Sequence, residues 1–356
     1  MSDDQHGYDA SRIVVLEWPE AVRRRPGMYI GSVGERGLRH MVLESAEELM
    51  EEVLEGAATV VDISLLPDGG VRVRNDGAGA ADLEAALTVP GEWPRPGRRV
   101  LGLGLAVVNA LSSRLVAETW REGSRWAQEF ERGVALGPAV RAGAAEGSGT
   151  AITFWPDREI FDTAELSFDA LAERFRELAF LYRELDLSLS DASGRSERYR
   201  APGGPAEFVA FLDSDDAEVI SFGCEDERMA GAAECSFRWR DSGGERVRSF
   251  ANGMATLGGG SHEVGLRAGL AAALTDFGRG RGLPVVVADQ VGAGLTAVVS
   301  VQLDRPEFEC CRRDRLGNAE VAAVVEREAR SRLGSWLAGH PAEADALVRR
   351  LSGNAW

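Results

Sequence analysis

The stretch "VLGLGLAVVNALSSRL" (residues 100–115) places a glycine turn directly before an apolar run. Gly102 and Gly104 alternate with leucines, and the residues after them are mostly Ala, Val and Leu. This pattern predicts a turn that leads into a buried helix. A second glycine turn that leads into a helix is predicted upstream, in "DGAGAADLEAALTV" (residues 76–89).

Helices and strands are predicted on both sides of these turns. A long helix is expected at about 36–55, and the β-branched runs that flank Pro67–Gly70 predict a β-hairpin. A helix rich in Leu and Arg is expected at about 165–184. After residue 214 the predicted order is strand, strand, helix, strand, and then an amphipathic helical stretch at 318–351. The sequence therefore predicts the α+β class.

The composition limits the classes of partner. A chain of 356 residues is long enough for two domains with their own cores. The net charge is −17 and all 40 basic residues are arginine, so the chain lacks the broad positive field on which non-specific nucleic-acid binding depends. No apolar run is long enough to span a membrane. The acidic start "MSDDQHGYDA" has no secretory h-region, so a cytoplasmic location is expected.

Cysteines and histidines are scattered and show no spacing typical of a metal site or a catalytic triad. All eight are interpreted as structural. They are Cys224, Cys235, Cys310, Cys311, His6, His40, His262 and His340.

Residues 43–56, "LESAEELMEEVLEG", contain six glutamates. At about 100° per residue, all six fit one polar arc of a helix. This arrangement taken alone is typical of a solvated helix face.

Six segments resemble, in order and approximate spacing, the ATPase region of the B subunits of DNA gyrase and topoisomerase IV, within the GHKL ATPases. They are "AVRRRPGMYIGS" (21–32), "RVRNDGAGA" (72–80), "LGLGLAVVNALS" (101–112), "GSGTAITFWP" (147–156), "GGGSHEVGLRAGL" (258–270) and "GLTAVVSVQLDRPEF" (294–308).

The resemblance implies a GHKL (Bergerat-type) α/β sandwich with an N-terminal arm at 1–213 and a ribosomal-protein-like α+β transducer domain at 214–356. The printed sequence stops at Trp356, where the family continues into its metal-binding (TOPRIM) and DNA-cleaving parts. The chain is therefore not expected to be a topoisomerase by itself.

The resemblance also implies roles for individual residues. Glu44 corresponds to the general base that activates the attacking water, and it is expected to face a nucleotide pocket. The other implied residues are Gly77 and Gly79 in the adenine-side turn, Gly102 and Gly104 in the phosphate loop, Thr150 beside the adenine, and Tyr8 and Ile13 in the arm that crosses to the partner of a homodimer.

Several pocket positions depart from the family's pattern. The Mg²⁺-binding asparagine is replaced by Glu48, and the aspartate that reads the adenine amino group is replaced by Asn75, with Asp76 directly after it. The histidine of the phosphate loop is Leu101. These replacements remove contacts that the family uses for ATP.

The lid and the transducer loop depart as well. Between Ala81 and Gly102 the segment is shorter than in the family and lacks its glycine-rich lid and lysine. The catalytic Gln-Thr-Lys loop is replaced by Cys311, Arg312 and Arg313, which leaves Arg313 as the candidate cation for a γ-phosphate.

Negative charge makes ATP turnover unfavourable. A carboxylate about 5 Å from a phosphate charge costs roughly 3 kcal/mol at an effective dielectric constant near 20. A magnesium ion held by Glu48 would offset part of that cost, because carboxylates are good ligands for this ion. ATP and Mg²⁺ are therefore expected only if the ancestral activity survives.

The first functional hypothesis is an acidic small-molecule pocket. Glu44, Glu48 and Glu52 are spaced i, i+4 and i+8, and Asp76 is expected opposite them, while the remaining glutamates of the stretch are expected to face solvent. Crowded carboxylates raise one another's pKa. Such a cluster suits a cationic or polyol ligand, or general-acid catalysis by Glu44, Glu48 or Asp76.

Three alternatives stay open on the sequence. The chain is a regulatory pseudo-subunit that pairs with gyrase subunits, a surviving ATP-binding module, or a folded relative without activity of its own.

Overall fold

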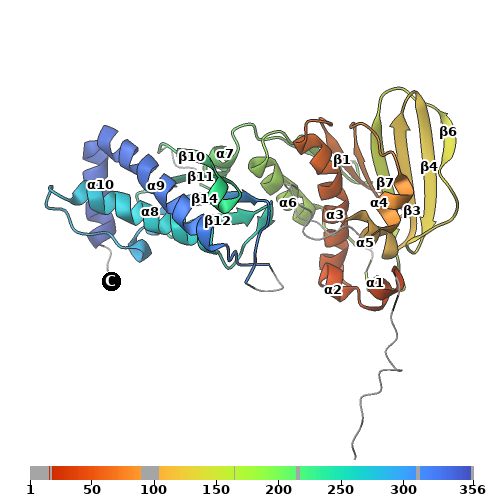
Figure 1. Ribbon diagram of the computed structural model, residues 1–356, viewed down its shortest axis with the longest axis horizontal. Coiled ribbons are helices and arrows are strands. Elements are labelled where there is room, and N and C mark those ends of the chain that lie inside the picture. Colours follow the sequence, from red (N-terminus) through yellow and green to blue (C-terminus); the bar gives the residue numbers. More distant parts are fainter. Residues whose placement is uncertain are drawn as a thin grey trace, which may run out of the picture.

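The computed structural model describes residue 16 and residues 18–89, 104–163, 165–213, 217–309 and 313–353. The predicted site residues Tyr8, Ile13, Leu101 and Gly102 lie outside this part of the chain. The described residues form two β-sheets with helices packed on each (Figure 1). The expected α+β class is confirmed.

The first sheet has nine strands in the order β5-β4-β3-β7-β2-β1-β8-β9, with β6 paired to β4. Its strands are β1 (Val61–Leu65), β2 (Val71–Asn75), β3 (Ser112–Arg121), β4 (Ser124–Glu131), β5 (Val134–Ala135), β6 (Val140–Ala144), β7 (Gly149–Pro156), β8 (Leu187–Ser190) and β9 (Ser196–Tyr199).

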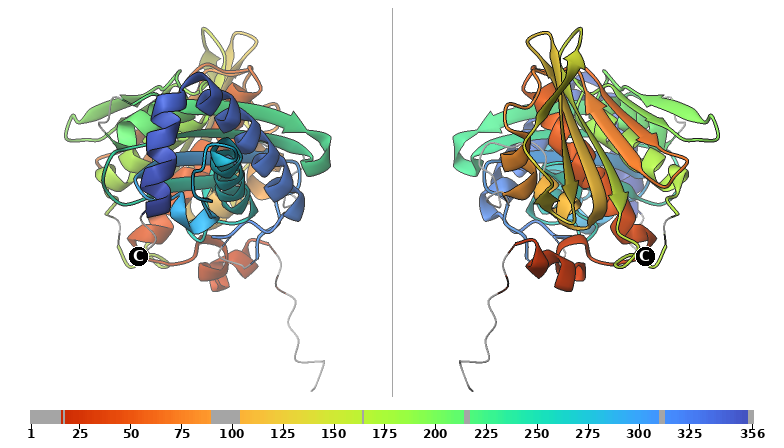
Figure 2. Two further views of the ribbon diagram at one scale, coloured as in Figure 1. Left: turned by 90° about the vertical axis from the view of Figure 1, so that its left-hand side faces the viewer. Right: turned by 90° about the vertical axis from the view of Figure 1, so that its right-hand side faces the viewer.

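Helices gather on one face of this sheet, and the right-hand view of Figure 2 shows its other face toward the viewer. The longest of them, α3, packs on β1 and β2. The helices of this part are α1 (Glu20–Arg24), α2 (Gly27–Ile30), α3 (Glu35–Leu54), α4 (Leu83–Thr88), α5 (Leu105–Ala110) and α6 (Phe168–Leu181).

The second sheet has five strands in the order β10-β11-β14-β12-β13. The strands are β10 (Ile220–Asp226), β11 (Gly231–Trp239), β12 (Arg246–Ala251), β13 (Met254–Ala255) and β14 (Leu295–Leu303). The helices are α7 (Pro205–Leu212), α8 (Ser261–Gly278), α9 (Ala319–Gly339), α10 (Pro341–Gly353) and the short 3-10 turns Glu227–Met229 and Ala288–Gln290.

The local sequence explains most of these elements. The expected helix at 36–55 is α3, and the expected hairpin is β1–β2, whose five antiparallel pairs run from Val61↔Asn75 to Leu65↔Val71. The expected helical stretch at 318–351 divides into α9 and α10, because Pro341 has no N–H group with which to continue a helix. The strand β10 was not predicted.

The two sheets meet through apolar side chains near α6. Phe180 stacks on Phe208 with ring centroids 4.7 Å apart, and Phe208 lies 6.1 Å from Phe250 of β12. Both Phe250 and Val298 of the second sheet belong to the hydrophobic cluster of the first. The expected division at 213/214 falls between α7 and β10 and stays a prediction, since α7 packs on β11 and β14.

Helices α8 and α9 cross at close range because two glycines leave room for the opposite backbone. A Cβ atom on Gly265 or on Gly269 would lie 2.4 Å from the carbonyl oxygen of Ala322 or of Glu326, respectively. Backbone atoms cannot rotate away as a side chain can, so any substituent would push the helices apart.

We therefore expect Gly269→Ala to lower the free energy of unfolding by about 1–3 kcal/mol, the usual cost of overpacking a close contact. The matched control is Gly334→Ala in α9, where an added Cβ meets nothing within 4 Å. That change is expected to stabilise the helix by about 0.5–1 kcal/mol. Urea unfolding of both variants measures the difference, and equal effects would contradict the packing argument.

Candidate functional site

The carboxylate of Glu44 lies at the centre of the candidate site. Glu44 is only 5% exposed, and its Oε2 accepts a hydrogen bond of 3.1 Å from the backbone N–H of Gly104, the residue before α5. Its Oε1 lies 2.9 Å from Nε2 of His40, one helical turn earlier. The predicted base is thus held by a histidine on one side and by the glycine loop on the other.

The role of His40 was missed at the sequence level, where all histidines were interpreted as structural. Burial opposes protonation of His40, but the neighbouring carboxylates of Glu44 and Glu47 outweigh it and raise the pKa of this imidazole above its ordinary value. The i, i+4 spacing of His40 and Glu44 on a predicted helix was the signal that could have found the pair.

Arg313 reaches the same site from the second part of the chain. Burial lowers the pKa of its guanidinium, while the charge of Glu44 acts in the opposite direction. The charge of Arg313 also acts on His40. The charge of Arg313 is thus felt at Glu44 and His40, and its role as the cation for a γ-phosphate stays a prediction.

Asn75 holds the glycine turn after β2 in place. Its Oδ1 accepts hydrogen bonds from the N–H groups of Thr150 (3.0 Å) and Gly77 (3.4 Å), and its Nδ2 donates to the carbonyl of Leu49 (3.3 Å). Thr150 in turn accepts a 3.0 Å hydrogen bond from the N–H of Ala80 through its hydroxyl. These contacts bring Asn75, Gly77 and Thr150 together, and their place beside a nucleotide stays a prediction.

Two glycines of this turn lie in close contacts, and the backbone requires glycine at one of them. Gly79 has φ +84°, and a Cβ atom there would lie 2.6 Å from the carbonyl oxygen of Trp120. A Cβ atom on Gly77 would lie 1.9 Å from Oε2 of Glu52. This Glu52 oxygen is buried and has no hydrogen-bond partner. The turn therefore carries an unsatisfied acceptor on its inner side.

A sequence profile described as DNA gyrase B matches residues 204–355. The DNA gyrase B protein of Streptomyces coelicolor is 38% identical over a region covering 98% of this chain. A novobiocin-resistant DNA gyrase B protein of Streptomyces niveus is 37% identical over 96% of it. The chain belongs to the DNA gyrase B family. It spans 57% of the length of each of these two relatives.

Solved structures of the gyrase B family share the fold. The 43K ATPase domain of Thermus thermophilus gyrase B, determined in complex with an aminocoumarin, has a TM-score of 0.79 at 30% identity, with 94% of both chains covered. The B-subunit of the DNA gyrase from Myxococcus xanthus has a TM-score of 0.82 at 28% identity, covering 93% of this chain and 99% of that one. The GHKL architecture expected from the motifs is confirmed.

Asp76 was expected opposite Glu44, Glu48 and Glu52, but its side chain is bound to the segment before β1 instead. Its side chain accepts hydrogen bonds from the N–H groups of Thr59 (2.7 Å) and Val60 (3.0 Å) and from the Thr59 hydroxyl. Burial opposes its ionisation, but these hydrogen bonds outweigh burial and hold the pKa of Asp76 below its ordinary value. Asp76 anchors the segment before β1.

The glutamates of α3 also differ from the expectation that only the pocket-facing ones are covered. Glu47 and Glu51 are buried, Glu48 and Glu52 are half-buried, and Glu55 is exposed. Glu47 lies 3.5 Å from the Arg174 guanidinium of α6. Segments such as α6 pack over Glu47 on α3. Helical periodicity alone does not predict this packing.

Metal ligands do not gather in the described part of the chain: no group of three or more His, Cys, Asp and Glu side chains there is arranged to hold an ion. Glu48 as a metal ligand stays a prediction. Within the described residues, every helix is too short or too polar to span a lipid bilayer.

Glu47 makes a pH-dependent contribution to stability. Burial raises the pKa of its carboxyl to about 7 from 4.5, although Arg174 acts in the opposite direction. A folded-state pKa above the unfolded value means that the folded chain holds the proton more tightly between these two pH values. The contribution is therefore fully present below about pH 4.5 and is lost as the pH rises to about 7.

We expect Glu47→Gln, which is neutral at every pH, to gain stability relative to the parent protein as the pH rises from 5 to 8. The gain is at most about 3 kcal/mol, from about 1.4 kcal/mol for each pKa unit. Chemical unfolding across this pH range measures it. Glu55→Gln, on the exposed side of the same helix, is the matched control and should show no such trend; a flat difference for Glu47→Gln would contradict the assignment.

Proposed function

We propose that the cleft of this gyrase B-type module binds a small molecule that carries a cationic amine, and that it does not turn over ATP. The observation that carries this proposal is the Oε2 atom of Glu52, which is buried against Gly77 without a hydrogen-bond partner. A buried carboxylate oxygen that lacks a donor costs free energy, so a ligand N–H group placed there is favoured.

The residues present fit a magnesium–ATP complex poorly. Oδ1 of Asn75 already accepts two backbone N–H groups, and its amide nitrogen would present a donor, not an acceptor, to an adenine amino group. The N–H of Gly104, which belongs to the phosphate-loop motif, donates to Glu44. The carboxylates of Glu44, Glu48 and Glu52 would also repel a triphosphate.

Binding is better supported than catalysis. A carboxyl with a pKa near 7, such as that of Glu47, has the proton affinity that general-acid catalysis needs. Glu47, however, lies beside Arg174 at 3.5 Å, and Asp76 is held by Thr59 and Val60. Both acids already have partners within the protein, whereas the buried oxygen of Glu52 has no hydrogen-bond partner among the described residues.

The second candidate is a surviving ATPase. The contact of 2.9 Å between His40 and Glu44 favours it, because a carboxylate paired with a histidine is suited to activating a water molecule. Pairing with a second copy or with gyrase subunits stays a prediction, as the arm residues Tyr8 and Ile13 lie outside the described part of the chain.

Amine binding is tested with spermidine and cadaverine as probes. We expect both to raise the melting temperature of the protein and to bind in isothermal titration. Glu52→Gln should weaken this binding by about 10-fold or more, because a hydrogen bond to a charged group contributes about 1.5–3 kcal/mol. Glu55→Gln is the matched control. Equal binding to the parent protein and to Glu52→Gln, or no binding to either, would reject the proposal.

Nucleotide binding is tested by restoring two residues of the family's pattern. We expect the parent protein to bind Mg²⁺ and a non-hydrolysable ATP analogue weakly. The double variant Glu48→Asn, Asn75→Asp should bind it about 100-fold more tightly, because Glu48→Asn removes roughly 3 kcal/mol of repulsion near the phosphates and Asn75→Asp restores an acceptor for the adenine amino group. Tight binding and phosphate release by the parent protein would establish the second candidate instead.

A further inference from the structure

A separate hollow of about 230 Å³ lies between the start of α4 and the β3–β4 pair. Its lining includes Ala81 and Glu84 from the α4 side, Arg121 of β3, Trp126 and Gln128 of β4, and Pro138 from the segment before β6. The gyrase B-type motifs and the proposed function assign no role to Arg121 or Trp126.

Strand register places the functional groups of the hollow on one face. Thr119 of β3 is opposite Trp126 of β4 and Arg121 is opposite Ser124, so Thr119, Arg121, Trp126 and Gln128 point to the same side of the sheet. Both amide hydrogens of Gln128 are used, since its Nε2 donates to Glu84 (2.8 Å) and to the carbonyl of Gly137 (3.0 Å). These bonds fix the side chain of Gln128 at the hollow.

Two acidic side chains line the hollow, and each already accepts a hydrogen bond within the protein. Asp82 caps α4 by accepting a 2.9 Å hydrogen bond from the N–H of Ala85. Glu84 accepts from Gln128. The guanidinium of Arg121, by contrast, makes no hydrogen bond or ion pair within the described residues, and it borders the hollow beside the indole of Trp126.

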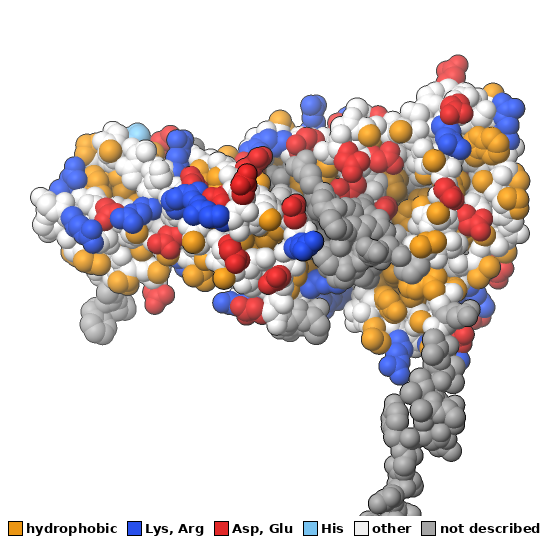
Figure 3. All heavy atoms as spheres, in the orientation of Figure 1, with side chains coloured by type: hydrophobic (Ala, Val, Ile, Leu, Met, Phe, Trp, Pro, Cys, Tyr) orange, Lys and Arg blue, Asp and Glu red, His pale blue; other side chains and the backbone are white. Residues whose placement is uncertain are grey.

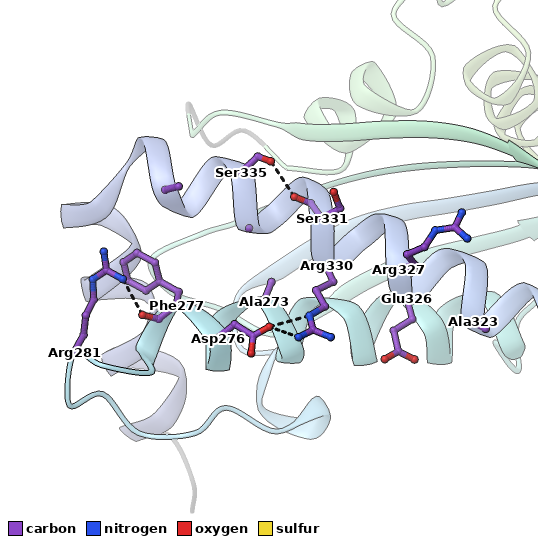
Figure 4. Close-up of a pocket in the computed structure, with 12 residues that line it drawn as sticks. Ala273, Asp276, Phe277, Arg281, Ala323, Glu326, Arg327, Arg330, Ser331 and Ser335 are labelled. Carbon is purple, nitrogen blue, oxygen red and sulfur yellow. Dashed lines mark hydrogen bonds and ion pairs between the residues drawn. The ribbon is translucent and has the colours of Figure 1, made fainter.

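The larger hollow between α8 and α9 differs in this respect. Figure 3 shows arginines gathered over these helices, and Figure 4 shows Arg330 held by Asp276 and Arg281 held by Phe277. Arg330 donates to Asp276 at 2.8 Å, Arg327 lies 3.0 Å from Asp226, and Arg281 packs on the ring of Phe277 at 4.0 Å. These guanidinium groups already interact with partners within the protein, so this hollow of about 920 Å³ is a weaker candidate for an anion-binding site.

We propose that the hollow between α4 and the β3–β4 pair binds a small planar carboxylate, with the guanidinium of Arg121 on the carboxylate and the indole of Trp126 against the flat ring. Arginine matches a carboxylate with two parallel N–H groups, and tryptophan offers a large aromatic face. The volume suits a molecule of one or two rings.

This ligand lies behind the glycine turn of the first site. The hydroxyl of Thr119, which lines the hollow, is 2.8 Å from the place of a Cβ on Gly79. Glu52 does not line the hollow, and its Oε2 lies against Gly77. The two proposed ligands therefore use different residues, and each is tested without the other.

The test uses 2-naphthoate and its neutral counterpart 2-naphthamide, titrated into the full chain by calorimetry and followed by ligand-observed NMR. We expect naphthoate to bind with an affinity of about millimolar, as is usual for a ligand of this size. Naphthamide should bind at least about 10-fold more weakly, because it lacks the charge that pairs with Arg121.

Variants separate this site from other arginines. Arg121→Gln should lose naphthoate binding by at least about 10-fold, and Trp126→Leu should weaken naphthoate and naphthamide equally. Arg332→Gln, an exposed arginine of α9, and Glu52→Gln should change neither. The circular dichroism and melting temperature of each variant show that it folds. Naphthoate that fails to bind the parent protein, binds Arg121→Gln equally well, or binds no better than naphthamide would overturn the proposal.

Discussion

Burial of the acidic helix α3 is the constraint on which the rest of this structure depends. Its glutamates are carried into the interior, where an uncompensated carboxylate costs several kcal/mol. Three groups stabilise the buried carboxylates. His40 of the same helix and the N–H of Gly104 contact Glu44, and Arg174 of α6 contacts Glu47. The arrangement of the helical layer follows from the need to bring these groups to the glutamates.

Because of this burial, most polar groups of the site are hydrogen-bonded within the protein, and one of them is not. Glu44 is held by His40 and Gly104, and the side-chain amide of Asn75 is taken up by the backbone of the turn and of α3. Groups that the family's pattern directs at a nucleotide are therefore directed at one another. The buried oxygen of Glu52 differs from them because it has no hydrogen-bond partner among the described residues, and it is the observation behind our proposal of an amine ligand.

Arg174 also connects this site to the second sheet. Its guanidinium donates to the carbonyl of Gly253, in the turn between β12 and β13, at 2.6 Å, while it faces Glu47 of α3. Beside it, the hydroxyl of Tyr182 accepts a 2.9 Å hydrogen bond from Gln302 of β14. Together with the Phe180–Phe208–Phe250 contacts, these bonds make α6 the element through which the two sheets share one core.

The sequence by itself determined the fold class, the β1–β2 hairpin and the extent of α3, because hydrophobic periodicity and glycine turns are local features. Its motifs also indicated the gyrase B family. It also predicted that Asn75, Gly77 and Thr150 belong to one turn region, and hydrogen bonds join these three residues in the structure. Only the tertiary structure decided that Asp76 turns to Thr59 and that Glu47 and Glu51 are covered. Helical periodicity predicts which residues lie on the same face of a helix. It does not predict which segments pack on that face, because these come from distant parts of the chain, such as α6 and the stretch around Arg313.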